Sequence, residues 1–161
     1  MEQMLVPHET SPIASVGEQC LSFTLDQEEY AVDILKVQEI KGYSALTPIP
    51  NAPPHIKGVM NLRGAVVPVI GLREKFGLPS VTYDKFTVVV IVRLGARVTG
   101  LVVDAVSDVL DLHECELRQK PDLGSRVDTS FITGMLQSKD RLVILLDVDR
   151  VANDTTSIAV A

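Results

Sequence analysis

The chain has 161 residues, of which 46% are hydrophobic and only 4% aromatic, and it contains no Trp. It is long enough to bury a core, which must be built from Val, Ile and Leu, residues that favour strands. The net charge of −6 argues against nucleic acid and anionic membranes as partners, because both attract basic clusters.

The first 18 residues predict a flexible tail, in which Pro7, Pro12 and Gly17 interrupt any regular pattern. They lack the basic and apolar regions of a signal peptide, and no apolar run reaches the roughly 20 residues that a membrane helix needs. The two cysteines, Cys20 and Cys115, fit a reducing compartment. We therefore expect a soluble cytoplasmic protein without direct membrane insertion.

From residue 20 onward, short β-type segments alternate with polar breaks. The order is a strand at 20–25, a turn at 26–29, an apolar segment at 30–40 and a proline-rich loop at 47–54. Within that loop, Pro53 and Pro54 favour one helical turn that ends near Gly58.

The next segment predicts a β-hairpin. Two apolar runs at 59–62 and 65–70 flank Arg63 and Gly64, and Gly64 can take the positive φ that a tight turn requires. Helical spacing at 72–76 predicts a short helix behind the hairpin. Dense runs of Val, Ile and Leu then predict buried strands at 87–92, 100–106 and 142–148.

The apolar pattern occurs twice. Ile56-x-Gly58 matches Ile132-x-Gly134, and at the same offset residues 66–70 fall on 142–146. Val-rich strands match one another easily, but glycines, strands and loops recurring in the same order favour duplication. We predict one domain over residues 19–152, made of two intertwined halves with a seam near 78–86, and a second tail at 153–161.

An enzyme is the sharpest alternative, and the sequence offers little for it. The G-x-S-x-G, P-loop and dinucleotide-binding motifs are absent. His113 and Cys115 are two residues apart and would share one side of a strand, but a zinc site needs three or four ligands. Asp33 and Asp104 recur in the two halves and suggest an acid–base pair. Duplication explains them better, as caps of a strand or turn in their own halves.

Two segments suggest a binding surface. Side chains alternate between the two faces of a strand, so Val37 and Glu39 would share one face, and Ile40 comes next in sequence. From spacing alone, a solvated barrel edge is the better interpretation, and the lip of a groove is the alternative. Arg63 lies in the hairpin turn with Asn61 just before it. A solubilising turn cation is the usual role, whereas a rigidly held guanidinium that pairs with Glu39 would be a functional one.

Three segments, at 30–40, 56–64 and 102–109, together resemble the CheW family of chemotaxis coupling proteins, and the similarity spans about residues 20–151. The resemblance implies a mainly β fold of two SH3-like, five-stranded β-barrels packed together, with short helices. It also implies no enzymatic activity and no cofactor. Where the family often has Asp, this chain has Gly71, while Asp147 keeps that place in the second half. We expect a lost helix cap at Gly71.

The resemblance further implies an adaptor that couples methyl-accepting chemoreceptors to the histidine kinase CheA. The receptor's cytoplasmic tip, a helical hairpin, would dock between the barrels, and CheA would bind through its C-terminal regulatory domain. In the absence of partners the protein would be a monomer. Its partners would hold it in a membrane-associated receptor array. A twitching-motility or second-messenger pathway is the alternative. Positions that match the receptor groove are Val37, Glu39, Ile40, Asn61, Arg63 and Val109, and kinase contacts carry over more loosely to Gly58 and Val89.

Overall fold

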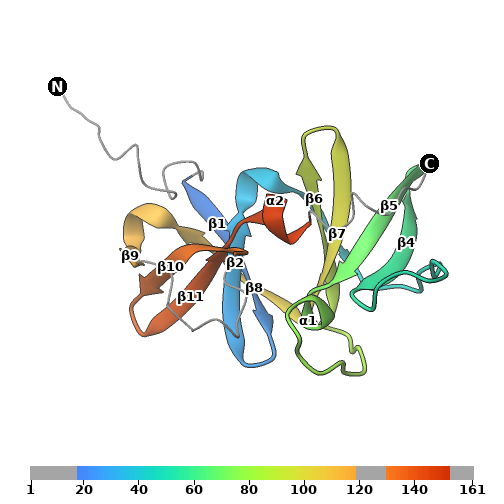
Figure 1. The fold of residues 1–161 in the computed structure, drawn as a ribbon. Helices are drawn as coiled ribbons and strands as arrows, with labels where there is room; N and C mark the ends of the chain where they lie inside the picture. Colours follow the sequence, from blue (N-terminus) through green and yellow to red (C-terminus); the bar gives the residue numbers. More distant parts are fainter. Residues whose placement is uncertain (1–17, 119–129, 153–161) are drawn as a thin grey trace.

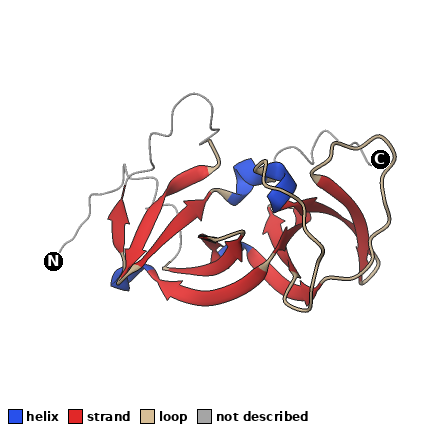
Figure 2. Cartoon of the chain, turned by 90° about the horizontal axis from the view of Figure 1, so that it is seen from below, coloured by secondary structure: helices blue, strands red, loops and turns tan. Residues whose placement is uncertain are grey.

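The structure is a computed structural model that describes residues 18–118 and 130–152, so the predicted tails lie outside the described residues, except for residue 18. Strands make up most of the described chain (Figure 2). They form two sheets that lie side by side as two lobes, with two short helices, α1 (Leu72–Lys75) and α2 (Val148–Val151), near the junction (Figure 1).

Each sheet forms a small barrel. The first barrel has the strand order β8-β1-β2-β11-β10-β9, and the second has β3-β6-β7-β5-β4. The strands of the first barrel are β1 (Gln19–Leu25), β2 (Glu28–Asp33), β8 (Ala105–Asp111), β9 (Glu116–Arg118), β10 (Ile132–Ser138) and β11 (Arg141–Leu146). Those of the second are β3 (Val37–Gly42), β4 (Ile56–Leu62), β5 (Ala65–Gly71), β6 (Val88–Leu94) and β7 (Arg97–Val103). The mainly β, two-barrel prediction is confirmed, and the short strand β9 is a sixth member of the first sheet.

The two halves of the chain exchange hairpins. The early hairpin β1–β2 pairs with β8 and β11 of the second half, and the later hairpin β6–β7 pairs with β3 and β5 of the first half. The repeated sequence pattern occupies corresponding places, because β4 and β10 each carry a bulge, between Ile56 and Gly58 and between Ile132 and Gly134. The strands β8-β1-β2-β11-β10 of the first barrel therefore correspond in order to β3-β6-β7-β5-β4 of the second, and β9 is additional.

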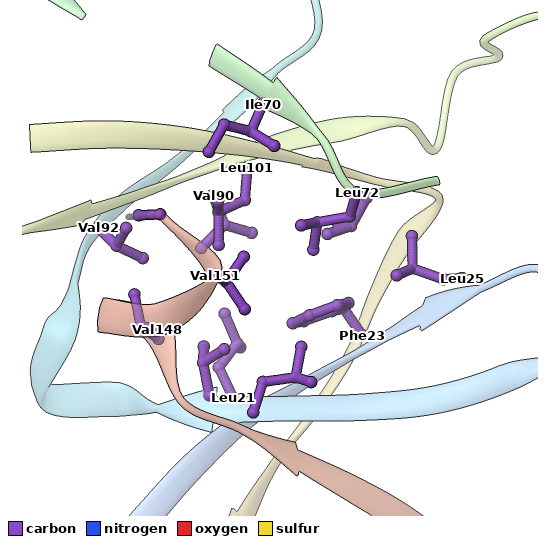
Figure 3. Close-up of a cluster of buried hydrophobic side chains, with 14 of the residues drawn as sticks. Leu21, Phe23, Leu25, Ile70, Leu72, Val90, Val92, Leu101, Val148 and Val151 are labelled. Atoms are coloured by element: carbon purple, nitrogen blue, oxygen red, sulfur yellow. The ribbon is translucent and has the colours of Figure 1, made fainter. Parts of the chain in front are cut away.

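The largest apolar cluster lies between the barrels. Side chains from β1, from β6 and from α2 point toward one another there (Figure 3). Its fully buried members include Phe23, Leu72 and Val151. Complete burial of side chains of this size is worth about 1.5–3 kcal/mol each. We call this set the inter-barrel cluster, and two smaller clusters fill the interiors of the first and second barrels.

Residues 30–40, predicted as one apolar segment, are divided between the barrels. β2 ends at Asp33, whose side chain accepts a hydrogen bond from the backbone N of Leu35 at 3.0 Å. This cap begins a short 3₁₀ helix, η2 (Ile34–Lys36), and β3 starts at Val37 in the other barrel. The turn thus carries the chain from one barrel to the next, and the prediction that Asp33 caps a turn in its own half is confirmed.

Two local predictions were wrong. The turn at 26–29 contains only Asp26 and Gln27, because Leu25 pairs directly with Glu28 in the β1–β2 ladder. The turn opened by Pro53 ends at Ile56 rather than near Gly58, because the backbone N of Ile56 donates to the Pro53 carbonyl at 3.0 Å and strand β4 begins at that residue. The backbone of residue 59 instead exchanges hydrogen bonds of 3.0 and 2.8 Å with that of residue 47, which extends the second barrel's pairing beyond β4.

Other local predictions are confirmed. Arg63 and Gly64 form the tight turn between β4 and β5 with φ values of 51° and 91°. Gly71 gives α1 no side-chain cap, whereas the Asp147 carboxylate accepts from the backbone N of Asp149 and Arg150 at the start of α2.

Candidate functional site

Strand β3 presents its residues to two different environments. Val37 and Ile40 lie opposite Val92 and Val90, which belong to the inter-barrel cluster. Glu39 lies opposite Ile91, which belongs to the cluster inside the second barrel. Directly opposite residues in an antiparallel pair share a face. The prediction that Val37 and Glu39 share one face is therefore wrong, because a β-bulge at Gln38 shifts the register between them.

The structure brings Glu39 and Arg63 together. Arg63 donates two hydrogen bonds to the Glu39 carboxylate, from Nη1 to Oε1 at 3.4 Å and from Nη2 to Oε2 at closer range. These bonds lower the pKa of Glu39 below its ordinary value and raise that of Arg63. The Asn61 Oδ1 accepts from the backbone N of Gly64 at 2.9 Å and steadies the turn. The pair joins β3 to the β4–β5 turn, that is, the two edges of the second sheet.

Val109 lies on the other barrel. It is on β8 opposite Leu21 of the inter-barrel cluster, so it occupies the same kind of position as Ile40 on β3. The two side chains are almost equally exposed, at 44% and 43%. The predicted receptor groove thus divides into an apolar border along the inter-barrel cluster and a polar end at Glu39, Asn61 and Arg63.

One border residue was missed. Val106 lies on β8 opposite Phe23 and packs against the inter-barrel cluster, as Val37 does from β3. The sequence signal for it is the spacing from Val106 to Val109, which equals that from Val37 to Ile40.

The two residues assigned loosely to kinase binding are both buried. Val89 is 0% exposed and packs in the interior of the second barrel. Gly58 is buried with φ of 142°, and a Cβ there would lie 2.5 Å from the carbonyl oxygen of Thr47. The Val89 side chain is enclosed and Gly58 has no side chain, so neither position presents a side chain on the surface.

A buried arginine that was also missed links the two halves. Arg73 of α1 donates from Nε and Nη2 to the two carboxylate oxygens of Asp104 at 2.8 and 2.7 Å, and from Nη1 to the carbonyl of Pro79 at 2.8 Å. Asp104 also accepts from the backbone N of Asp26 in the β1–β2 turn at 2.8 Å. The prediction that Asp104 caps a turn in its own half is wrong, because its partners Asp26 and Arg73 both lie in the first half.

The metal-site alternative gains no support from the geometry. His113 is exposed in the 3₁₀ helix η3 (Leu112–Glu114), while Cys115 ends that helix and packs inward near Cys20. They do not share one side of a strand as predicted. Burial raises the pKa of Cys20 to about 12. Among residues 18–118 and 130–152, His, Cys, Asp and Glu side chains form no group of three that could hold a metal ion.

The helices of the described chain are all too short or too polar to cross a membrane. Within the same residues, the surface carries an apolar border between two barrels and the Glu39–Arg63 ion pair beside it. This fold and site define a two-barrel protein-interaction module. The chain belongs to the CheW family, since the sequence profile of the CheW-like domain matches residues 19–156.

Relatives from several bacteria match over most of their length. The chain is 48% identical over 136 residues to a chemotaxis protein CheW of Klebsiella aerogenes, covering 84% of this chain and 82% of that protein. It is 32% identical over 142 residues to a chemotaxis protein CheW of Bacillus subtilis, covering 88% of this chain and 90% of that protein. The crystal structure of the scaffolding protein TtCheW from Thermoanaerobacter tengcongensis superposes with a TM-score of 0.73 at 32% identity, covering 81% of this chain and 88% of that one.

Proposed function

We propose that the chain is a non-enzymatic scaffold of bacterial chemotaxis that couples chemoreceptors to the histidine kinase CheA. The observation that carries this proposal is the 48% identity to a chemotaxis protein CheW over more than four-fifths of both chains. The names of the relatives favour chemotaxis over a twitching-motility or second-messenger pathway. As a scaffold the protein acts in the cytoplasm. It is a monomer in the absence of partners, and its partners hold it within receptor arrays.

The receptor tip, a helical hairpin, docks along the border between the barrels. Val37, Ile40 and Val109 provide apolar area beside the inter-barrel cluster, and the Glu39–Arg63 pair forms a polar rim. A guanidinium already held by a carboxylate loses little conformational freedom on binding, which favours its use in recognition. The regulatory domain of CheA binds at barrel edges, as the membership in the CheW family implies.

The proposal is tested by co-sedimentation with a receptor cytoplasmic fragment, with and without the CheA regulatory domain. We expect the protein to bind each partner and to form a ternary complex larger than either pair. Binding to neither partner would refute the scaffold assignment.

Arg63→Asp tests the groove within the same assay. It places two carboxylates together in the polar rim, so it should abolish receptor binding while leaving binding to the kinase domain intact. The matched control is Lys85→Asp, which reverses an exposed cation in the loop between α1 and β6 and should change neither. Normal ternary assembly by Arg63→Asp would remove Arg63 from the groove.

A further inference from the structure

The proposed docking surface is one-sided, although the barrels that form it are matched. Of its six residues, Val109 alone lies on the first barrel. Yet β8 repeats the arrangement of β3 around the inter-barrel cluster. Val106 and Val109 face the cluster as Val37 and Ile40 do, and each strand carries a bulge just after its first valine. The apolar part of the surface is thus nearly symmetric across the two barrels.

The polar part is also repeated, with one difference. Asp108 follows the bulge of β8 as Glu39 follows the bulge of β3. Its cation is Arg141, at the start of β11, whose Nη1 lies 3.6 Å from Asp108 Oδ2. Arg141 also donates to both carboxylate oxygens of Glu29, from Nε at 3.1 Å and from Nη2 at closer range. In the second barrel, by contrast, Arg63 contacts the single carboxylate of Glu39.

This difference leaves an excess negative charge at the end of the first barrel. The Glu29 side chain is only 16% exposed. Burial alone would raise its pKa, but hydrogen bonds from Arg141 and Ser22 outweigh burial and hold the pKa below its ordinary value. Glu29 is therefore ionised at neutral pH and neutralises Arg141. The Asp108 carboxylate accepts from the backbone N of Val109 at 2.8 Å, but it is 58% exposed and remains accessible to a cation of a partner.

We propose that the docking surface extends across β8, with Val106 and Val109 as its second apolar half and Asp108 as its charged margin. Its occupant is a helical segment of the receptor tip whose apolar face is bordered by a lysine or arginine that meets Asp108. This inference rests on the proposed function. Because the apolar floor is alike on both sides, the charge at Asp108 sets which way the hairpin lies across the barrels. Arg141, held by Glu29, is a positioning residue.

The test compares Asp108→Asn and Asp108→Lys with Glu116→Gln and Glu116→Lys. Glu116 is a matched control, because it is an exposed carboxylate of the same barrel, on β9, and pairs with Arg118 at 3.1 Å. The readout is the dissociation constant for a receptor cytoplasmic-tip fragment at several salt concentrations. We expect Asp108→Asn to weaken binding about threefold and to flatten its salt dependence, and Asp108→Lys to weaken it by about tenfold or more. The Glu116 variants should stay within about twofold.

A charge-exchange experiment separates recognition from structural damage. Receptor fragments in which single lysines or arginines of the tip are replaced by Glu are tested against Asp108→Lys. One of them should restore binding, which a purely structural role of Asp108 would not produce. Normal binding by both Asp108 variants, or no restoration by any fragment, would overturn the inference. If Arg63→Asp loses binding while Asp108→Lys does not, this inference alone fails. If the unchanged protein does not bind the fragment, the proposed function fails with it.

Discussion

The Arg73→Ala substitution should weaken the junction between the two halves of the chain. Arg73 is only 9% exposed, and its guanidinium makes three hydrogen bonds of 2.7 to 2.8 Å, two of them to the Asp104 carboxylate. Its Nη2 also lies 3.5 Å from the Asp26 carboxylate in the β1–β2 turn. Removing it leaves Asp104 without its counter-charge in a largely buried setting.

The expected loss is about 3 kcal/mol in the free energy of unfolding. Removing one partner of a buried ion pair costs about 3–5 kcal/mol. The lower end applies because Asp104 keeps the backbone hydrogen bond from Asp26 and its side chain is 26% exposed. For a chain of this size, each kcal/mol shifts the melting temperature by about 2–4 °C, so the melting temperature should fall by about 6–12 °C.

The measurement is urea and thermal unfolding followed by far-ultraviolet circular dichroism, since the chain has no Trp to report by fluorescence. A double-mutant cycle with Asp104→Asn should give a coupling energy above about 1 kcal/mol. The control is Arg150→Ala on α2, whose side chain is 64% exposed and lies 3.7 Å from Asp147, and it should cost less than about 1 kcal/mol. An Arg73→Ala loss no larger than that of Arg150→Ala would refute the reasoning.

Three further substitutions test other parts of the fold. Val37→Ala should lower the unfolding free energy by about 1–2 kcal/mol as well as weaken receptor binding, because Val37 packs against the inter-barrel cluster. An unchanged melting temperature would show that Val37 does not belong to the core. Asp147→Ala should cost about 1 kcal/mol by removing the cap of α2, as measured by urea unfolding. Glu29 has a folded-state pKa below its ordinary 4.5, so its stabilisation is present above about pH 4.5 and is lost as pH falls. Glu29→Gln should therefore flatten the decline in stability between about pH 5 and pH 3, and an unchanged decline would assign acid lability to other groups.

Several predictions that depended on local chemistry succeeded, although the bounds of two turns were wrong. The β4–β5 hairpin follows from alternating apolar runs around a glycine that can take positive φ, and these signals lie within a dozen residues. The missing cap at Gly71 and the present cap at Asp147 followed from single residue types. The repeat placed equivalent glycines at equivalent bulges because the barrels are matched.

Predictions that depended on distant partners failed. The division of residues 30–40 between two barrels is decided by which strands the segment pairs with, and one of them, β6, lies some fifty residues further along. The bulge in β3 is set by the same cross-strand register, so spacing alone placed Val37 and Glu39 on one face. Arg73 was missed for a related reason, since its partner Asp104 is 31 residues away in sequence. The sequence pattern raised the Glu39–Arg63 pair only as an alternative to a solubilising turn cation, and it gave no sign of Asp108.

The exchange of hairpins sets an order in which the protein can fold as it leaves the ribosome. The β1–β2 hairpin emerges early, but its neighbours β8 and β11 belong to the later part of the chain, and the Ser22–Asp108 hydrogen bond spans 86 residues. The second barrel has all its strands once β7 has emerged, whereas the first must wait for β11. Until then β1 and β2 lack part of their sheet, and the incomplete chain exposes apolar surface and unpaired strand edges, which favour aggregation.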